Sequence, residues 1–128
     1  TTSSGRLGLP AEYGLSWVLP RLVGVGAAAD LLFSSRVVLA EEAERMGLVN
    51  RVYAANELLS ATLEYARTIA REISPSSLRE SKRQLYADLH RDVGSAVVEA
   101  EALLERMATE PDFREGVAAW KERRPPRF

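Results

Sequence analysis

Apolar residues recur at intervals of three or four along most of this chain, which is the spacing of amphipathic helices. The clearest case is one apolar stripe made by Leu59, Leu63, Ala66, Ala70 and Ile73. The same pattern predicts further helices over residues 14–23, 25–33, 40–46, 77–89, 93–108 and 112–123. Two short stretches are predicted to be extended: residues 36–39 are rich in β-branched side chains, and residues 48–53 have an alternating character.

Polar residues and glycine mark where these helices begin and end. Gly47 stands where a helix commonly stops, directly after the predicted helix 40–46. Asn56 is predicted to cap the next helix, and Asp112 is predicted to cap the last one. Ser74-Pro75 should break the chain, and Ser77–Glu80 has the spacing of a capping box that begins a new helix.

The first two predicted helices contain two features with more than one interpretation. Pro20 should either limit its helix or mark a junction between two helical turns. Gly24-x-Gly26-x-x-Ala29 has the spacing of a dinucleotide-binding loop. No strand-like run precedes that motif, so close helix packing is the favoured interpretation.

The stretch Gly8–Gly14 holds the chain's main candidate for chemistry. Its glycines permit a tight loop before a helix, and this places the carboxylate of Glu12 just ahead of the helix. The helix dipole favours the ionised carboxylate, whereas burial among apolar neighbours favours the neutral form. If burial dominates, Glu12 could exchange a proton near neutral pH. The alternative is that Glu12 acts only as a helix cap or a first-turn charge.

Composition excludes several kinds of chemistry. The 128 residues are 46% hydrophobic and 27% charged, as in ordinary globular proteins. A net charge of −1 gives no general basis for binding nucleic acid or an anionic membrane, and no apolar run of transmembrane length was expected. Cysteine is absent, which removes disulfides and thiolate chemistry; His90 is the single histidine and is expected to be solvated. We expect no metal site and a cytoplasmic protein.

An ordered set of short motifs resembles the enoyl-CoA hydratase/isomerase (crotonase) family. In chain order they are Gly8-Leu9, Ala11-Glu12-x-Gly14, Ser16-Trp17, Leu19-Pro-Arg-Leu-Val-Gly24, Ala40-Glu-Glu-Ala43, Gly47-Leu-Val-Asn-Arg-Val52 and Arg123-Arg-Pro-Pro-Arg-Phe128. The resemblance implies an α/β crotonase-like spiral fold, of which this chain is the mostly α-helical C-terminal portion with two short extended segments. It further implies that residues 1–73 complete the core with an active-site loop and helix, and that residues 74–128 form a helical trimerisation region.

The resemblance also implies a reaction on an acyl-CoA thioester, in fatty acid metabolism. Glu12 would be the catalytic acid/base, and the acyl group would contact Leu9, Pro10, Tyr13 and Trp17. By the same resemblance, family hydratases use two glutamates: one lies in the half of the fold that this chain does not match, and the position of the second falls on Ser4 here. This departure favours double-bond isomerisation slightly over hydration. The backbone donors that stabilise the thioester enolate would come from the half of the family fold that this chain does not match.

The last helix carries a second set of predicted contacts. By resemblance, Trp120 and Arg123 reach the adenosine part of CoA bound to a neighbouring subunit, and Leu104 matches a more variable contact. The alternative is a solvated helix end whose cations interact with the helix dipole. No cofactor is expected beyond CoA as part of the substrate, and the expected assembly is a homotrimer or a hexamer. The competing function is a non-catalytic helical oligomerisation module or an inactive crotonase-like subunit.

Overall fold

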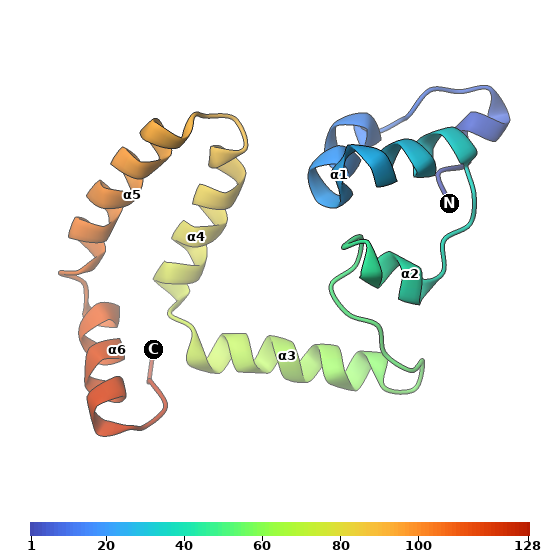
Figure 1. Cartoon of the computed structure of the whole chain (residues 1–128). Helices are drawn as coiled ribbons and strands as arrows, with labels where there is room; N and C mark the ends of the chain where they lie inside the picture. The colour runs from blue at the N-terminus through green and yellow to red at the C-terminus, as the bar shows by residue number, and fades with distance from the viewer. The chain divides into compact units, whose positions relative to one another are not determined.

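The computed structural model describes residues 1–128, and every regular element in it is a helix (Figure 1). The chain divides into two compact units, Thr1–Leu58 and Leu59–Phe128. The first unit contains the 3₁₀ helix η1 (Ser3–Leu7) and the helices α1 (Leu15–Ser34) and α2 (Ala40–Arg45). The second contains α3 (Leu58–Glu72), α4 (Pro75–Asp88), α5 (Val93–Met107) and α6 (Pro111–Glu122). The first residue of α3, Leu58, belongs to the first unit. The functional division into a core portion, residues 1–73, and a trimerisation region, residues 74–128, stays a prediction.

Helix α1 is two helices joined at a kink. Gly24 has φ 79° and ψ 161°, which lie outside the helical region and separate the predicted helices 14–23 and 25–33. The junction was predicted at Pro20, which instead lies inside the first helix. Gly24 makes the kink because glycine alone adopts that backbone conformation without a steric penalty from Cβ.

The stop at the end of α2 is confirmed. Gly47 has φ 79°, and its N–H donates to the carbonyl of Glu44 at 3.0 Å. The next N–H, from Leu48, donates to the carbonyl of Ala43 at 2.8 Å. This pair of bonds is the Schellman motif, which needs a left-handed residue between the helix and the outgoing chain.

The two segments predicted to be extended form no β-strand. Leu39 has extended backbone angles, φ −88° and ψ 167°, but residues 36–39 pair with no other segment. In the segment 48–53, the N–H of Val52 donates to the side chain of Glu44 at 3.1 Å and not to a strand. An extended segment becomes a strand only when its backbone groups pair with a neighbouring strand, and this chain provides none.

Helix starts in the second unit differ from the predicted caps. The cap of α4 lies three residues before the predicted one: it is Ser74, not Ser77, and the oxygen of its side chain accepts from the N–H of Ser77 at 3.1 Å. Pro75 is thus the first helical residue, where its fixed φ is favourable, and does not break the chain after Ser74. Asp112 lies within the first turn of α6 and does not cap it. Asn56 lies in the turn two residues before α3 begins.

Side-chain bonds hold η1 to the end of α1. Thr2 Oγ1 donates to the carbonyl of Leu31 at 2.6 Å, and Ser35 Oγ donates to the carbonyl of Thr2 at 3.0 Å. A Cβ on Gly5 would lie 2.7 Å from Ser35 Oγ, so only glycine permits this close approach. The small core of the first unit lies on the same helix and is built around Leu19, Ala28 and Leu31.

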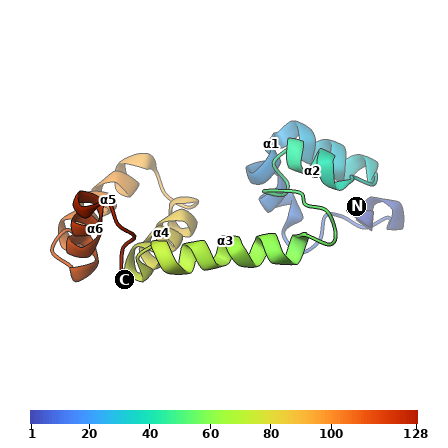
Figure 2. The ribbon, with the colours of Figure 1, turned by 90° about the horizontal axis from the view of Figure 1, so that it is seen from below.

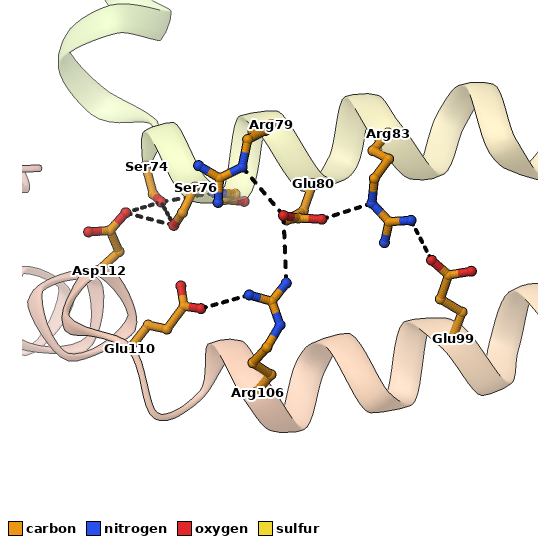
Figure 3. Close-up of polar contacts among 10 residues, drawn as sticks. Ser74, Ser76, Arg79, Glu80, Arg83, Glu99, Arg106, Glu110 and Asp112 are labelled. Carbon is orange, nitrogen blue, oxygen red and sulfur yellow. Dashed lines mark hydrogen bonds and ion pairs between the residues drawn. The ribbon is translucent and has the colours of Figure 1, made fainter.

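Helices α4 and α5 run side by side and are joined by charged side chains (Figures 1 and 3). Glu80 on α4 is only 13% exposed and contacts Arg83 at 3.0 Å, Arg79 at 3.4 Å and Arg106 of α5 at 3.6 Å. Arg83 also pairs with Glu99 of α5 at 2.6 Å. Hydrogen bonds from Arg83 first, and then from Arg79, hold the pKa of Glu80 below its ordinary value of 4.5.

The apolar stripes of the second unit are largely uncovered. Leu103 and Ala119 are its only buried apolar residues. The predicted stripe of α3 stays exposed, with Leu59 at 71% and Leu63 at 43% exposure. An amphipathic helix is stabilised mainly by burying its apolar face, so these stripes are surfaces suited to packing against further protein.

Helix α1 has the length and composition of a membrane span, contrary to the expectation from the sequence. It has 20 residues, its most apolar window has a mean hydropathy of 1.4, and 17% of that window is buried. Core helices of soluble proteins have the same properties, and the kink at Gly24 interrupts this one. The helix therefore does not assign a membrane role by itself.

Candidate functional site

The loop before α1 is shaped by three residues in the left-handed region. Gly8, Tyr13 and Gly14 have φ values of 71°, 54° and 77°. Gly14 is the N-cap of α1, and no side chain caps this helix. The carbonyl of Glu12 accepts from the N–H of Leu15 at 3.0 Å and closes the last turn of the loop. The carboxylate of Glu12 is therefore not a helix cap, and Glu12 lies before the first turn of α1, which holds no acidic residue, so neither structural interpretation holds.

The side chain of Glu12 is exposed, so the expected apolar wall around it is not formed within this chain. Tyr13 is 99% exposed and Leu9 is 47% exposed, and neither covers the carboxylate. The two left-handed residues that follow Glu12 turn the backbone toward α1, and the side chain of Glu12 stays exposed. Any burial of Glu12 has to come from protein beyond these residues.

A cavity of about 320 Å³ lies beside this loop, between η1 and the end of α1. It is lined by Thr2, Ser4, Gly5, Leu9, Pro10, Ala11, Ser16, Leu32 and Phe33. The structure thus brings Leu9 and Pro10 of the predicted acyl site together with Ser4, while Glu12, Tyr13 and Trp17 are not among the lining residues. No carboxylate lines the cavity.

Trp17 is held by Arg21 one turn later on α1. The guanidinium carbon of Arg21 lies 3.9 Å from the centre of the indole ring, which is a cation–π contact. Nη1 of Arg21 also donates to the carbonyl of Trp17 at 2.9 Å. Both contacts of Arg21 are therefore with Trp17 of its own helix.

The end of α6 gathers an aromatic ring and three cations. Trp120, Lys121, Arg123 and Arg124 line one shallow hollow with Ala119, and Trp120 is 80% exposed. Arg123 ends the helix in the left-handed conformation, with φ 52° and ψ 41°. For a residue with a side chain this conformation costs about 1–2 kcal/mol. The structure therefore places Trp120 and Arg123 at one hollow, and their contact with CoA stays a prediction.

Glu115 is a residue of this region that the sequence did not single out. Its carboxylate binds the guanidinium of Arg124 through both oxygens, at 2.6 and 3.1 Å, and accepts from the N–H of Arg127 at 2.7 Å. These bonds, led by that from Arg124, lower the pKa of Glu115 from 4.5 to about 2. A separation of nine residues is not a helical spacing, so no pattern in the sequence indicated this pair.

Leu104 lies in a different cavity and not at the end of α6. This second cavity, of about 330 Å³, is lined by Ser74, Ser76, Ser77, Gln84, Ala100, Leu103, Leu104, Met107, Ala108, Glu110, Asp112 and Phe113. At its polar edge, Asp112 accepts from Ser74 Oγ at 2.5 Å and Ser76 Oγ at 2.7 Å, tying α6 to α4 (Figure 3). These hydroxyls hold the pKa of Asp112 below its ordinary value.

The structure brings together no group of three or more His, Asp or Glu side chains that could hold a metal ion. His90 is exposed at the turn after α4, as expected for a solvated histidine. Asp112, at the second cavity, binds hydroxyl groups, and Glu115, on α6, binds a guanidinium group.

Solved structures identify the class of fold. A probable enoyl-CoA hydratase/isomerase from Mycobacterium abscessus superposes with a TM-score of 0.91 at 33% identity, over 97% of this chain and 51% of that one. Among curated proteins, a probable enoyl-CoA hydratase from Mycobacterium tuberculosis is 39% identical over 92% of this chain and 42% of its own length. Short-chain-enoyl-CoA hydratase from Clostridium acetobutylicum is 34% identical over 92% of this chain and 45% of its own length.

The helices described above are thus a helical portion of the crotonase-like fold. A sequence profile of the enoyl-CoA hydratase/isomerase family matches residues 1–128, and the chain belongs to that family. The chain spans less than half the length of the curated relatives that it matches. Family membership, predicted from short motifs, is confirmed over the whole chain.

Proposed function

We propose that this chain supplies the acid/base loop and part of the CoA-binding surface of an acyl-CoA enzyme, in which Glu12 moves a proton on an enoyl-CoA thioester. One observation supports this most: Glu12 is the only acidic residue before Asp30, and it follows directly on a cavity lined by Leu9, Pro10 and Ser4. A carboxylate beside a partly apolar cavity is suited to proton transfer next to a thioester carbonyl.

Double-bond isomerisation is the reaction that a single carboxylate can complete. Glu12 would remove a proton from carbon 2 of a 3-enoyl thioester, and the resulting enolate would be stabilised by backbone N–H donors from outside this chain. The same carboxylic acid would then return the proton to carbon 4, giving the 2-enoyl thioester and the ionised carboxylate. No water is added, so no second carboxylate is needed.

Hydration is the second candidate, and the names of the relatives favour it. The curated proteins from Clostridium acetobutylicum and Mycobacterium tuberculosis are both named as enoyl-CoA hydratases. Against it, the position of the second hydratase glutamate carries Ser4, which lines the cavity but cannot serve as an acid/base near neutral pH. Comparing 2-enoyl-CoA and 3-enoyl-CoA as substrates of the intact protein distinguishes the two reactions.

The variant Glu12→Gln should reduce turnover of a 3-enoyl-CoA by at least a factor of about 100, since an amide cannot accept and return the proton. The measurement is kcat with 3-enoyl-CoA, alongside binding of a CoA ester by calorimetry, which should persist. Glu41→Gln is the matched control, because Glu41 is an exposed glutamate of α2 away from the loop. Unchanged turnover in Glu12→Gln would show that another group is the base.

The same proposal includes a covered active site. Glu12 is exposed here and the apolar stripe of α3 is uncovered, so we propose that both are covered when the family's spiral core and neighbouring subunits are assembled around this chain. The proposed assembly is a homotrimer or a dimer of trimers. Light scattering on the intact protein measures its mass, and a monomer at micromolar concentration would contradict the assembly.

A further inference from the structure

We propose that Glu115 is a positioning residue for CoA: it holds the turn after α6 so that the cation of Arg123 stands beside Trp120. This inference rests on the proposed function, since it concerns how the adenosine end of a CoA thioester is bound. It adds to that function a residue that would act through Arg124 without touching the substrate.

The backbone at Arg123 is the first observation. The N–H of Arg123 donates to the carbonyl of Trp120 at 3.3 Å, and the N–H of Arg124 donates to the carbonyl of Ala119 at 3.1 Å. This is the motif that ends α2, where the left-handed residue is Gly47. Glycine is the residue expected at such a position, and a strained arginine there persists only when its surroundings hold it.

Glu115 holds the backbone at Arg123 indirectly, through contacts with residues that follow it in the chain. Both oxygens of the carboxylate accept hydrogen bonds from the guanidinium of Arg124, and one of them also accepts from the N–H of Arg127. Residues on the C-terminal side of Arg123 are therefore fixed back onto the first half of α6, and the tail turns back beside the helix (Figures 1 and 2). A two-point guanidinium–carboxylate pair fixes orientation as well as distance, which a single contact does not.

Charge assigns different tasks to the two arginines. Arg124 pairs with Glu115 at 2.6 Å and with Glu122 at 2.6 Å, so its charge is balanced by carboxylates. No ion pair involves Arg123 or Lys121 in the structure, and both line the hollow with the indole of Trp120. The adenine ring of CoA can stack on the indole while the phosphates on its ribose bind these two cations, and Arg124 serves to hold the turn.

The test compares two thioesters of the same acyl group on the intact protein. One is the CoA thioester, and the other is the N-acetylcysteamine thioester, which lacks adenosine and phosphates. In Glu115→Gln, KM for the CoA thioester should rise roughly tenfold at unchanged kcat, because a neutral amide no longer fixes Arg124. KM for the short thioester should not change. Arg124→Gln should give the same pattern, since it breaks the same pair.

The control is Glu105→Gln, an exposed glutamate of α5, which should leave both KM values unchanged. An equal rise of KM for both thioesters, or a fall in kcat, would show that Glu115 supports the fold generally and would overturn the proposal. So would an unchanged KM for the CoA thioester. Circular dichroism checks that each variant is folded, and Arg124→Lys, with one point of contact in place of two, provides an intermediate case.

Calorimetry with adenosine 3′,5′-bisphosphate separates this inference from the proposed reaction. If the intact protein turns over neither thioester, the proposed reaction fails, and the ratio of Kd values between wild type and Glu115→Gln still tests the positioning role. A roughly tenfold weaker Kd in Glu115→Gln supports the proposal. Equal Kd values, or no binding by wild type, overturn it.

Discussion

At the scale of single residues, the same backbone geometry ends two helices, at a glycine in one and at an arginine in the other. Gly47 and Arg123 both adopt a left-handed conformation between the same two hydrogen bonds. At Gly47 the sequence alone predicted the stop, because glycine has no Cβ to hinder that geometry. At Arg123 it predicted the helix end approximately but not the strain, because arginine gives no signal for a positive φ.

Replacing Gly47 by alanine should lower the free energy of unfolding of the intact protein by about 1 kcal/mol, because alanine has to adopt φ near 79° there. Gly26→Ala is the matched control. A Cβ on Gly26 would have no neighbour within 4 Å, and this residue lies in the helical second half of α1. That change should stabilise by up to about 1 kcal/mol. Urea unfolding measures both, and equal effects of the two changes would contradict the argument.

At the scale of elements, charge pairs rather than apolar packing join α4 to α5. The apolar positions Leu78, Leu85 and Val97 are 47%, 64% and 49% exposed. Glu80 and Glu99, in contrast, bind guanidinium groups between the two helices. The helices themselves were predictable from their periodicity, but which residues of α4 would face α5 was not, since the charged and the apolar faces could each have done so.

The variant Glu80→Gln should lower the stability of the intact protein at pH 7, and the loss should shrink in acid. The pKa of Glu80 is lowered on folding, so its contribution is complete above its ordinary pKa of 4.5 and is lost as pH falls through the lower folded value. Thermal unfolding at pH 7 and below pH 4 measures this difference. Glu101→Gln, at an exposed site on α5, should have no effect at either pH. A loss that is the same at both pH values would contradict the ion-pair origin.

At the scale of the whole molecule, the second unit of the chain fully buries few apolar side chains. Buried apolar side chains there are limited to Leu103 and Ala119. Ordering each residue of the backbone costs about 1–2 kcal/mol, and these few buried groups cannot offset that cost. The exposed stripes of α3 to α5 are therefore the surfaces on which we propose that further protein packs.

The variant Leu63→Asp should disrupt the assembly of the intact protein, because it places a charge in the middle of the α3 stripe, where we propose that further protein packs. Size-exclusion chromatography with light scattering should show a smaller species or aggregated, unfolded protein. Leu63→Met keeps an apolar side chain of similar volume and should leave the assembly intact. A fully assembled Leu63→Asp protein would show that this stripe faces solvent.

The sequence by itself determined the helices, the turn after α2, the Glu12 loop and the family, because periodicity, glycine and short motifs are local properties of the chain. Only the tertiary structure decided what depends on residues distant in sequence. Ser74 and Asp112 meet across 38 positions, and Arg124 is fixed by Glu115 nine positions earlier. The exposure of Glu12 is also a tertiary property, since burial depends on what packs over the loop. Local patterns record backbone preferences, whereas these contacts arise only when separate elements pack together.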